Sequence, residues 1–308
     1  MKAETNLQKI LARGEFAVTC EYNPPRGIDV DSIRQNAAQL KGKVDAVNVN
    51  DNTNATVRMS SWALSRILLD EGIEPVLQMV TRDRNRIALQ SDLLGASALG
   101  IQNVLCLTGD HPSKGDHPEA KGVFDLDAVQ WITAAKQIRD DGLLMNGKSI
   151  SGKPKLFIGA VANPFVRSVE LHIIRLQKKV VAGAEFIQTQ PALDMPRFEG
   201  WLAEATQRGI TDKCFIIAGV IALRSVAMAQ HLRSNVPGIM IPDSIMDRLD
   251  AQPQDRQLEE GIDICVECIK ALKQMKAVRG VHIMAIGCEE NIPEIIEKAK
   301  LLPRPDLS

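Results

Sequence analysis

The sequence predicts an α/β protein folded as a single (β/α)8 barrel, a TIM barrel, over residues 1–308. Eight short apolar runs alternate with eight amphipathic stretches, and this alternation is typical of parallel strands covered by helices. Most of the runs are almost continuously apolar, as expected for strands that are buried on both faces. A length of 308 residues is common for one such barrel.

The predicted strands follow one another at similar intervals along the chain. They are Ala17–Glu21, Ala46–Asn50, Glu74–Val80, Asn103–Thr108, Leu156–Ala160, Phe186–Gln190, Phe215–Gly219 and His282–Ile286. The helices expected after them are Asp31–Leu40, Ser60–Glu71, Arg84–Leu99, Asp127–Asp140, Ser168–Ala182, Met195–Arg208, Ser225–Ser234 and Gln257–Met275. Glycine stands where several of these helices should end, which is its usual capping position.

Three further segments extend the predicted barrel. Residues 1–13 are expected to form an amphipathic N-terminal helix, and residues 109–125 and 237–257 to form long loops at the active-site end. An open, doubly wound sheet is the alternative architecture. No Gly-x-Gly-x-x-Gly motif follows the first strand, so a Rossmann nucleotide site has no support.

Charge and composition exclude several functional classes. The net charge is −1, which argues against a general affinity for nucleic acid or for an anionic membrane. No run approaches the roughly 20 apolar residues of a membrane span, and the N-terminus lacks a signal-peptide core. The six cysteines are scattered and suggest no disulfide framework, so a cytoplasmic protein is expected.

Glu21 ends the first predicted strand directly before a turn. Pro24 and Pro25 fix the backbone and remove two amide donors, so the strand cannot continue past Asn23. The carboxyl ends of barrel strands are where catalytic groups collect. Glu21 is therefore a candidate catalytic acid, and a solvated acid at a strand end is the alternative.

Other polar residues end the later strands and should meet Glu21 at the same mouth. They are Asn48, Asn50, Asp51, Asn52, Gln78, Thr108, Gly109, Asp110, Asn163, Gln188, Gln190 and Arg224. Amides both donate and accept hydrogen bonds, which suits a heterocycle with alternating donors and acceptors. This set favours recognition of a planar ring and a hydride transfer, with Glu21 and Asp110 in different roles.

Two other groups of side chains raise the question of a metal. His111 and His117 lie near several carboxylates, but their segment has the composition of a solvated loop. Cys265 and Cys268 form a lone Cys-x-x-Cys inside a helical pattern, where packing is the simpler explanation. No metal site is expected.

Four short motifs stand at or near the ends of predicted strands and helices. They are Glu21-Tyr-Asn-Pro-Pro, Leu107-Thr-Gly-Asp110, Lys179-Val-Val-Ala-Gly-Ala184 and Phe186-Ile-Gln-Thr-Gln190. With them the chain resembles the methylenetetrahydrofolate reductase family, flavin-dependent barrel enzymes of one-carbon metabolism. The runs Thr-Gly-Asp-His-Pro, Gly-Asp-His-Pro and Val-Phe-Asp-Leu-Asp are similar to a bacterial branch that includes acetogen-type enzymes.

The resemblance implies reduction of 5,10-methylenetetrahydrofolate to 5-methyltetrahydrofolate, for methionine biosynthesis or the acetyl-CoA pathway. In the family, an acid at the position of Glu21 helps to open the imidazolidine ring, and flavin N5 then gives hydride to the exocyclic carbon. Asp110 matches an aspartate that contacts the pterin and tunes flavin reduction. Gln190 matches a glutamine that hydrogen-bonds the folate.

The resemblance also implies a flavin site. Its expected residues are Asn50, Gln78, Thr108, Gly109, Asp110, Phe124, Asn163 and Lys179. Lys179 matches a lysine at the flavin phosphate, and Phe124 stands for an aromatic residue beside the flavin. Better-known relatives carry arginine, histidine, tyrosine and aspartate at the positions aligned with Thr108, Gln78, Val161 and His172. The predicted cofactor is FAD. Because several dinucleotide contacts of the family are lost here, FMN is the alternative.

Two other functions share these features. One is a flavin-free barrel that transfers the methyl group of methyltetrahydrofolate to a corrinoid, and the other is an electron-relay subunit of a larger reductase. For the lead function, the expected partners are 5,10-methylenetetrahydrofolate and either NAD(P)H or a partner electron-transfer subunit. A homo- or hetero-oligomer is expected.

Overall fold

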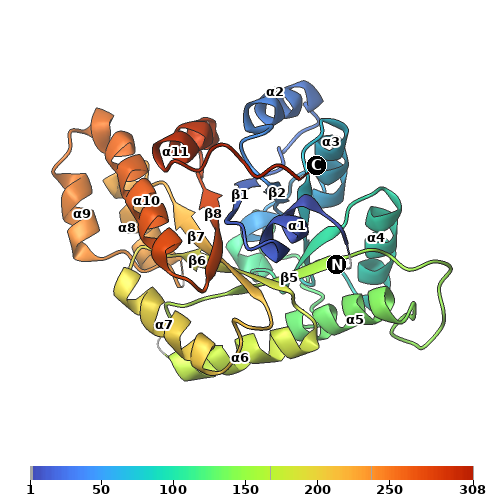
Figure 1. The fold of residues 1–308 in the computed structure, drawn as a ribbon. Coiled ribbons are helices and arrows are strands. Elements are labelled where there is room, and N and C mark those ends of the chain that lie inside the picture. Colours follow the sequence, from blue (N-terminus) through green and yellow to red (C-terminus); the bar gives the residue numbers. More distant parts are fainter. Residues whose placement is uncertain (1–2, 167, 237, 308) are drawn as a thin grey trace.

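Eight parallel strands close into a barrel in the computed structural model, which describes residues 3–166, 168–236 and 238–307 (Figure 1). The strands follow chain order around the barrel, and the first strand pairs with the eighth. The predicted (β/α)8 barrel is therefore confirmed. The strands are β1 Ala17–Tyr22, β2 Ala46–Val49, β3 Pro75–Val80, β4 Asn103–Leu107, β5 Phe157–Ala162, β6 Phe186–Pro191, β7 Phe215–Ile221 and β8 Val278–Met284.

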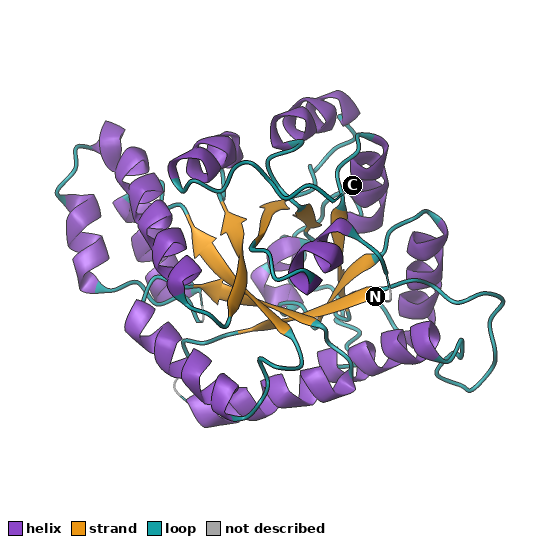
Figure 2. Ribbon diagram, in the orientation of Figure 1, coloured by secondary structure: helices purple, strands orange, loops and turns teal. Residues whose placement is uncertain are grey.

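Helices surround the strands on the outside of the barrel (Figure 2). The surrounding helices are α2 Val30–Leu40, α3 Ser61–Asp70, α4 Arg86–Ala98, α5 Ala128–Asp140, α6 Val169–Ala182, α7 Met195–Gln207, α8 Val226–Asn235, α9 Asp243–Asp250, α10 Gln257–Gln274 and α11 Ile292–Lys298, and α1 Asn6–Ala12 lies across one end of the barrel. The predicted N-terminal helix is shorter than expected, and residues 1–2 lie outside the described residues. Within the described ranges, no helix has the length and apolar character needed to cross a membrane.

The eighth strand lies earlier in the chain than the sequence predicted. It begins at Val278 instead of His282, and Gly280 pairs with Ala17 of β1. A Cβ atom on Gly280 would lie 2.5 Å from the carbonyl oxygen of Ala17, so the close approach of the strands needs glycine here. Because glycine weakens a strand pattern, the start of β8 was missed. As a result, His282 lies within the strand and not at its beginning.

Two helices were also not predicted. The segment expected as a loop at 237–257, of which residue 237 lies outside the described residues, contains α9 and a 3-10 helix over Gln254–Arg256. Helix α11 follows β8. Both helices span only seven or eight residues, and a stretch this short offers too few positions for apolar periodicity to distinguish a helix from a loop.

The amino end of the barrel is closed by α1. Leu7 and Leu11 are fully buried against side chains from the inner faces of the strands. The Glu74 carboxylate, directly before β3, accepts hydrogen bonds from the backbone amides of Asn6 (2.5 Å) and Leu7 (2.9 Å). These contacts hold the free amino end of α1 on the barrel.

Aromatic rings fill the barrel interior above this helix. Phe157 and Phe186 stack with ring centroids 4.8 Å apart. A Cβ atom on Gly159 would lie 2.2 Å from the Phe186 ring, so the missing side chain makes room for it. This part of the interior is therefore packed, and polar side chains gather at the carboxyl end.

Candidate active site

A buried polar network lies inside the barrel beneath its carboxyl end. The side chains of Asn48 and Gln188 exchange two hydrogen bonds, of 2.6 and 3.0 Å. The Thr19 hydroxyl lies 3.0 Å from Nδ1 of His282. All four residues are buried, so these mutual contacts satisfy groups that water does not reach.

Glu21 lies at the upper edge of this network. Strand alternation places Glu21 on the inner face of β1 with Thr19, while Cys20 and Tyr22 point outward. The Glu21 side chain is only 13% exposed, and its Oε2 atom lies 3.9 Å from Nε2 of His282. The carboxyl group is therefore held inside the mouth and beside a histidine.

The turn after β1 is fixed to the neighbouring loop. The side-chain oxygen of Asn23 accepts hydrogen bonds from the Asn50 amide (2.8 Å) and the Thr53 hydroxyl (3.1 Å). The Pro24 carbonyl accepts one from the Arg58 guanidinium (3.0 Å). These bonds limit the movement of the segment that carries Glu21.

The mouth holds a cavity of about 380 Å3. Eight of the ten predicted site residues line it, and they come from five strands or strand ends and from one helix. They are Glu21, Asn50, Gln78, Thr108, Gly109, Asp110, Lys179 and Gln190. The structure thus brings together residues that are far apart in the sequence, and we name this space the mouth pocket.

The other two predicted residues lie elsewhere. Asn163 lines an adjoining pocket of about 170 Å3, which shares Val161, Lys179 and Gln190 with the mouth pocket. Phe124 is among the residues lining neither pocket, and its ring stacks with that of His111 at 6.3 Å. The role predicted for Phe124 beside a flavin stays a prediction.

A glycine turn brings Asp110 to the rim of the mouth. Gly109 has a φ of +88°, in the region that favours glycine. A Cβ atom on Gly109 would also lie 3.0 Å from the Cβ atom of Val80. The backbone carbonyl of Asp110 accepts a hydrogen bond from the Arg82 guanidinium (3.3 Å), and its side chain is exposed.

Ion pairs after β3 stiffen this wall of the mouth. Arg82 is buried and pairs with Asp83 at 2.7 Å. Arg84 pairs with the buried Asp51 at 2.7 Å, and Asp51 also accepts from the Val80 amide. Burial alone would lower the pKa of Arg84, but the Asp51 and Asp92 carboxylates together outweigh it, so the pKa is raised.

Lys179 reaches the mouth from α6. Its ammonium group donates a hydrogen bond of 2.7 Å to the Val161 carbonyl at the end of β5. Burial lowers the pKa of Lys179, and the nearby Arg175 lowers it further. Lys179 is therefore a partly desolvated cation that an anionic ligand would stabilise.

The segments considered for metal binding have other contacts. His111 bonds to Ser113, and His117 lies 3.5 Å from Glu119. Among the described residues, no group of three or more metal-binding side chains is placed to hold an ion. Cys265 and Cys268 are buried free cysteines of α10, in agreement with a packing role.

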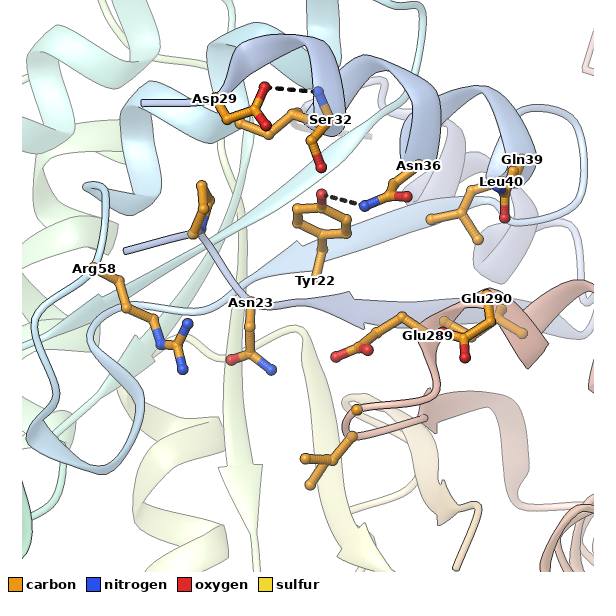
Figure 3. A pocket seen from close by; sticks show the side chains of 15 residues that line it. Tyr22, Asn23, Asp29, Ser32, Asn36, Gln39, Leu40, Arg58, Glu289 and Glu290 are labelled. Atoms are coloured by element: carbon orange, nitrogen blue, oxygen red, sulfur yellow. Dashed lines mark hydrogen bonds between the residues drawn. The ribbon is translucent and has the colours of Figure 1, made fainter. Parts of the chain in front are cut away.

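A second cavity, of about 530 Å3, lies beside the mouth between α2 and α11 (Figure 3). The Asn36 amide donates to the Tyr22 hydroxyl at 3.0 Å, and the carboxylates of Glu289 and Glu290 line the opposite side. Burial raises the pKa of Tyr22. This cavity is larger than the mouth pocket, but it contains none of the ten predicted residues, and Asn23 lies between the two.

Comparison of the sequence with protein-family models identifies the family of this chain. A family model described as methylenetetrahydrofolate reductase matches residues 6–300. The chain belongs to the methylenetetrahydrofolate reductase family. The resemblance of its motifs is therefore confirmed.

Relatives of different lengths match the chain. It is 24% identical over 305 residues to a probable methylenetetrahydrofolate reductase (NADPH) of Caenorhabditis elegans. This alignment covers 96% of this chain and 44% of the nematode protein. It is 22% identical over 285 residues to 5,10-methylenetetrahydrofolate reductase of Pectobacterium carotovorum, and that alignment covers 90% of this chain and 88% of the bacterial protein. The chain thus spans less than half of the nematode relative and most of the bacterial one.

A solved structure supports the fold of this family member. An uncharacterized protein from Clostridium thermocellum, described as binding two copies of 5-methyl-5,6,7,8-tetrahydrofolic acid, superposes with a TM-score of 0.66 at 14% identity. The match covers 97% of this chain and 99% of that one. At this identity the likeness concerns the barrel alone.

His282 and Arg82 are among the residues of the mouth pocket that were not predicted from the sequence. His282 was taken as the start of a strand, and Arg82 was not considered. For His282, a signal was present in its spacing: it stands two residues after Gly280 and two before Met284, on one face of the strand. Arg82 follows β3 in an irregular segment, where no periodicity predicts the direction of a side chain.

Proposed function

We propose that this chain reduces 5,10-methylenetetrahydrofolate to 5-methyltetrahydrofolate with a bound flavin as hydride carrier. The observation that carries the proposal is that Glu21, Asp110 and Gln190 line one cavity together with Lys179. Family membership supports a folate substrate. The description of the Clostridium protein as binding a methylated folate gives the same support.

The mouth pocket suits a flavin. Its amides from Asn50, Gln78 and Gln190 offer donors and acceptors to a heterocycle, and Gly109 lets the backbone come close. Lys179 offers a partly buried cation for the anionic end of the cofactor. When bound, the flavin supplies hydride from N5, and FAD and FMN are both compatible with the family resemblance.

Glu21 is the proposed catalytic acid. Its carboxyl group gives a proton to N10 of the folate, the bond from N10 to the bridging carbon breaks, and that carbon becomes an iminium able to accept hydride. His282 is a positioning residue, because Thr19 holds its ring and its Nε2 atom faces Glu21 at 3.9 Å. Both groups lie inside the mouth, where water is limited.

The remaining polar residues orient the substrate. Gln190 projects into the mouth beside the network formed by Gln188 and Asn48, and it is the proposed hydrogen-bond partner of the pterin. Asp110 stands across the mouth, and we propose that it contacts the pterin next to the flavin. Orientation of this kind places the acceptor carbon for the transfer.

We propose NAD(P)H, or a partner electron-transfer subunit, as the source of electrons. The name of the nematode relative specifies NADPH. A flavin held in the mouth pocket would carry electrons from this donor, and the same pocket would also have to admit the folate.

One experiment tests the proposed function. The purified chain is reconstituted with FAD or FMN, reduced with dithionite under anaerobic conditions, and mixed with 5,10-methylenetetrahydrofolate. Re-oxidation of the flavin together with formation of 5-methyltetrahydrofolate, measured by absorbance and mass spectrometry, is the expected result. Methyl transfer from 5-methyltetrahydrofolate to cobalamin without flavin would instead support the methyltransferase alternative. Because dithionite reduces the flavin directly, the result does not depend on which natural electron donor the chain uses.

A further inference from the structure

The cavity between α2 and α11 has no part in the proposed function. We name this space of about 530 Å3 the outer pocket. Its volume lies within the range of roughly 300–1,000 Å3 that is typical of small-molecule sites. Ile33, Leu40, Ile286 and Ile292 give it apolar surface, and polar and charged side chains complete the lining. This mixture is typical of a site that binds and orients a small ligand.

Opposite charges line two sides of the outer pocket. Figure 3 shows the Arg58 guanidinium on one side and the carboxylates of Glu289 and Glu290 on the other. The side chains of Tyr22 and Asn23 lie between them. Arg58 belongs to the loop after β2, whereas both glutamates belong to the segment after β8, so closure of the barrel brings the two charges to the same cavity. The outer pocket is therefore bipolar.

The acidic side of the outer pocket lacks a cation. Within the described ranges, neither the Glu289 nor the Glu290 carboxylate has a hydrogen bond or an ion pair. Burial raises the pKa of Tyr22, and the charges of Glu289 and Asp29 raise it further, so both carboxylates act on the wall of the pocket. An ammonium group would supply the missing positive charge.

The other side of the outer pocket offers donors that lack acceptors. Nη1 of Arg58 donates to the Pro24 carbonyl, but Nε is buried without a hydrogen-bond partner among the residues that the structure describes. The side-chain oxygen of Asn23 already accepts from Asn50 and Thr53, which leaves its amide hydrogens to donate. Because a buried donor without a partner costs free energy, a carboxylate on this side would stabilise the site.

We propose that the outer pocket binds a small zwitterion with an ammonium group at one end and a carboxylate at the other. The ammonium group lies beside Glu289 and Glu290, and the carboxylate faces Arg58 and the Asn23 amide. The Tyr22 ring and the apolar side chains pack against the part between the two charges. Short peptides with free termini belong to this class. Because the site needs neither flavin nor folate, it is independent of the proposed function.

A ligand with only one kind of charge fits the outer pocket less well. A diamine would bring one ammonium group to the side of Arg58, and a dicarboxylate would bring one end to the side of the two glutamates. Each of these contacts between like charges costs free energy. The zwitterion meets an opposite charge at both ends.

The test uses alanine peptides as probes. Dialanine, trialanine and tetra-alanine, which differ in the separation of their termini, are titrated into the purified chain by calorimetry. The peptide that binds most tightly is then compared with its N-acetylated form, which has no ammonium group, and with its C-amidated form, which has no carboxylate. We expect each blocked form to bind at least about tenfold more weakly, the effect of one charged hydrogen bond or more. Equal or tighter binding of either blocked form would overturn the proposal, as would the absence of binding by all three free peptides.

Variants of the charged side chains then test which end of the peptide each one contacts. Glu289→Gln and Glu290→Gln should each weaken the free peptide by about tenfold and leave the N-acetylated form within twofold, because that form has no ammonium group. Arg58→Gln should weaken the free peptide similarly and leave the C-amidated form within twofold.

Glu259→Gln is the matched control, since Glu259 is an exposed glutamate of α10 that does not line the outer pocket. It should bind the free peptide like the parent chain. An equal loss of free and blocked peptide in the three test variants would contradict the assigned contacts, because a general disturbance of the cavity would not distinguish the two ends.

Discussion

The two ends of the barrel carry different kinds of side chain, although the same eight strands build both. At the amino end, Leu7 and Leu11 of α1 pack against strand side chains and stacked aromatic rings. At the carboxyl end, Glu21 and His282 face each other beside a cavity of about 380 Å3. The difference suggests that changes at the amino end should alter stability and those at the carboxyl end chemistry.

The largest effect is expected from Glu21→Gln at the carboxyl end. The amide keeps the size of the side chain but cannot give its proton to the folate, so folate reduction should fall by about 100-fold or more. Rapid-mixing measurements of the reduced enzyme with 5,10-methylenetetrahydrofolate give this rate.

The control for this variant is Glu15→Gln, which changes an exposed glutamate just before β1 at the opposite end. It should leave the rate unchanged. Both variants should bind flavin and unfold like the parent chain. A Glu21→Gln rate close to that of the parent would remove Glu21 as the acid.

The next effect is expected at the amino end, from Leu7→Ala. Leu7 is fully buried, and removing its side chain leaves a cavity between α1 and the strands. The free energy of unfolding should fall by about 2–5 kcal/mol. Denaturant titration measures this change, and Leu171→Ala, at a leucine that is 49% exposed on α6, is the control.

The Leu7→Ala variant also tests whether the two ends of the barrel act independently. At a temperature where the variant is folded, its rate of folate reduction should match that of the parent. A slow rate with unchanged flavin binding would show that the ends are coupled.

A smaller effect is expected from His282→Gln, which returns to the carboxyl end. The glutamine can still bond to Thr19, but it loses the ring nitrogen that faces Glu21 at 3.9 Å. Since His282 acts through Glu21, the turnover number should fall by about tenfold with little change in KM. Steady-state kinetics as a function of pH measures both, and a change confined to KM would assign His282 to substrate binding.

The sequence predicted the barrel and most of the mouth for physical reasons. Parallel strands buried on both faces give apolar runs that are easy to see, and the carboxyl ends of such strands converge, which places Glu21 beside Asp110 and Gln190. The start of β8 was not visible because the close packing at Ala17 requires Gly280, a residue that weakens the strand signal.

Other features depend on long-range contacts that have no local pattern. Phe124 follows a loop whose course is set by a bond from the Val123 amide to the Arg82 carbonyl, 41 positions earlier in the chain. Arg82 itself is directed by partners on three different loops. Such directions are fixed only when the loops meet, so the sequence could predict neither the placement of Phe124 nor the part played by Arg82.

The smallest expected effect is the pH dependence that Glu74, at the amino end, gives to the stability of the fold. Burial raises the pKa of Glu74, even though the amides of Leu7 and Asn6 and the side chain of Asn103 donate hydrogen bonds to its carboxylate. The folded chain therefore holds this proton at a higher pH than the unfolded chain does. The contribution of Glu74 to stability is present below the ordinary glutamate pKa and is lost as pH rises through the folded value.

The variant Glu74→Gln tests whether stability falls, as predicted, when the pH rises through this range. The free energy of unfolding of the parent chain should decline across that pH window by an amount that the variant, which cannot titrate here, does not show. Denaturant titrations in steps from pH 4 to pH 8, roughly the range between an ordinary glutamate and neutrality, measure the difference between the two slopes. Glu15→Gln serves again as the exposed control. If the parent gains stability relative to Glu74→Gln as pH rises, then the hydrogen bonds to α1 outweigh burial, and closure of the amino end is partly electrostatic.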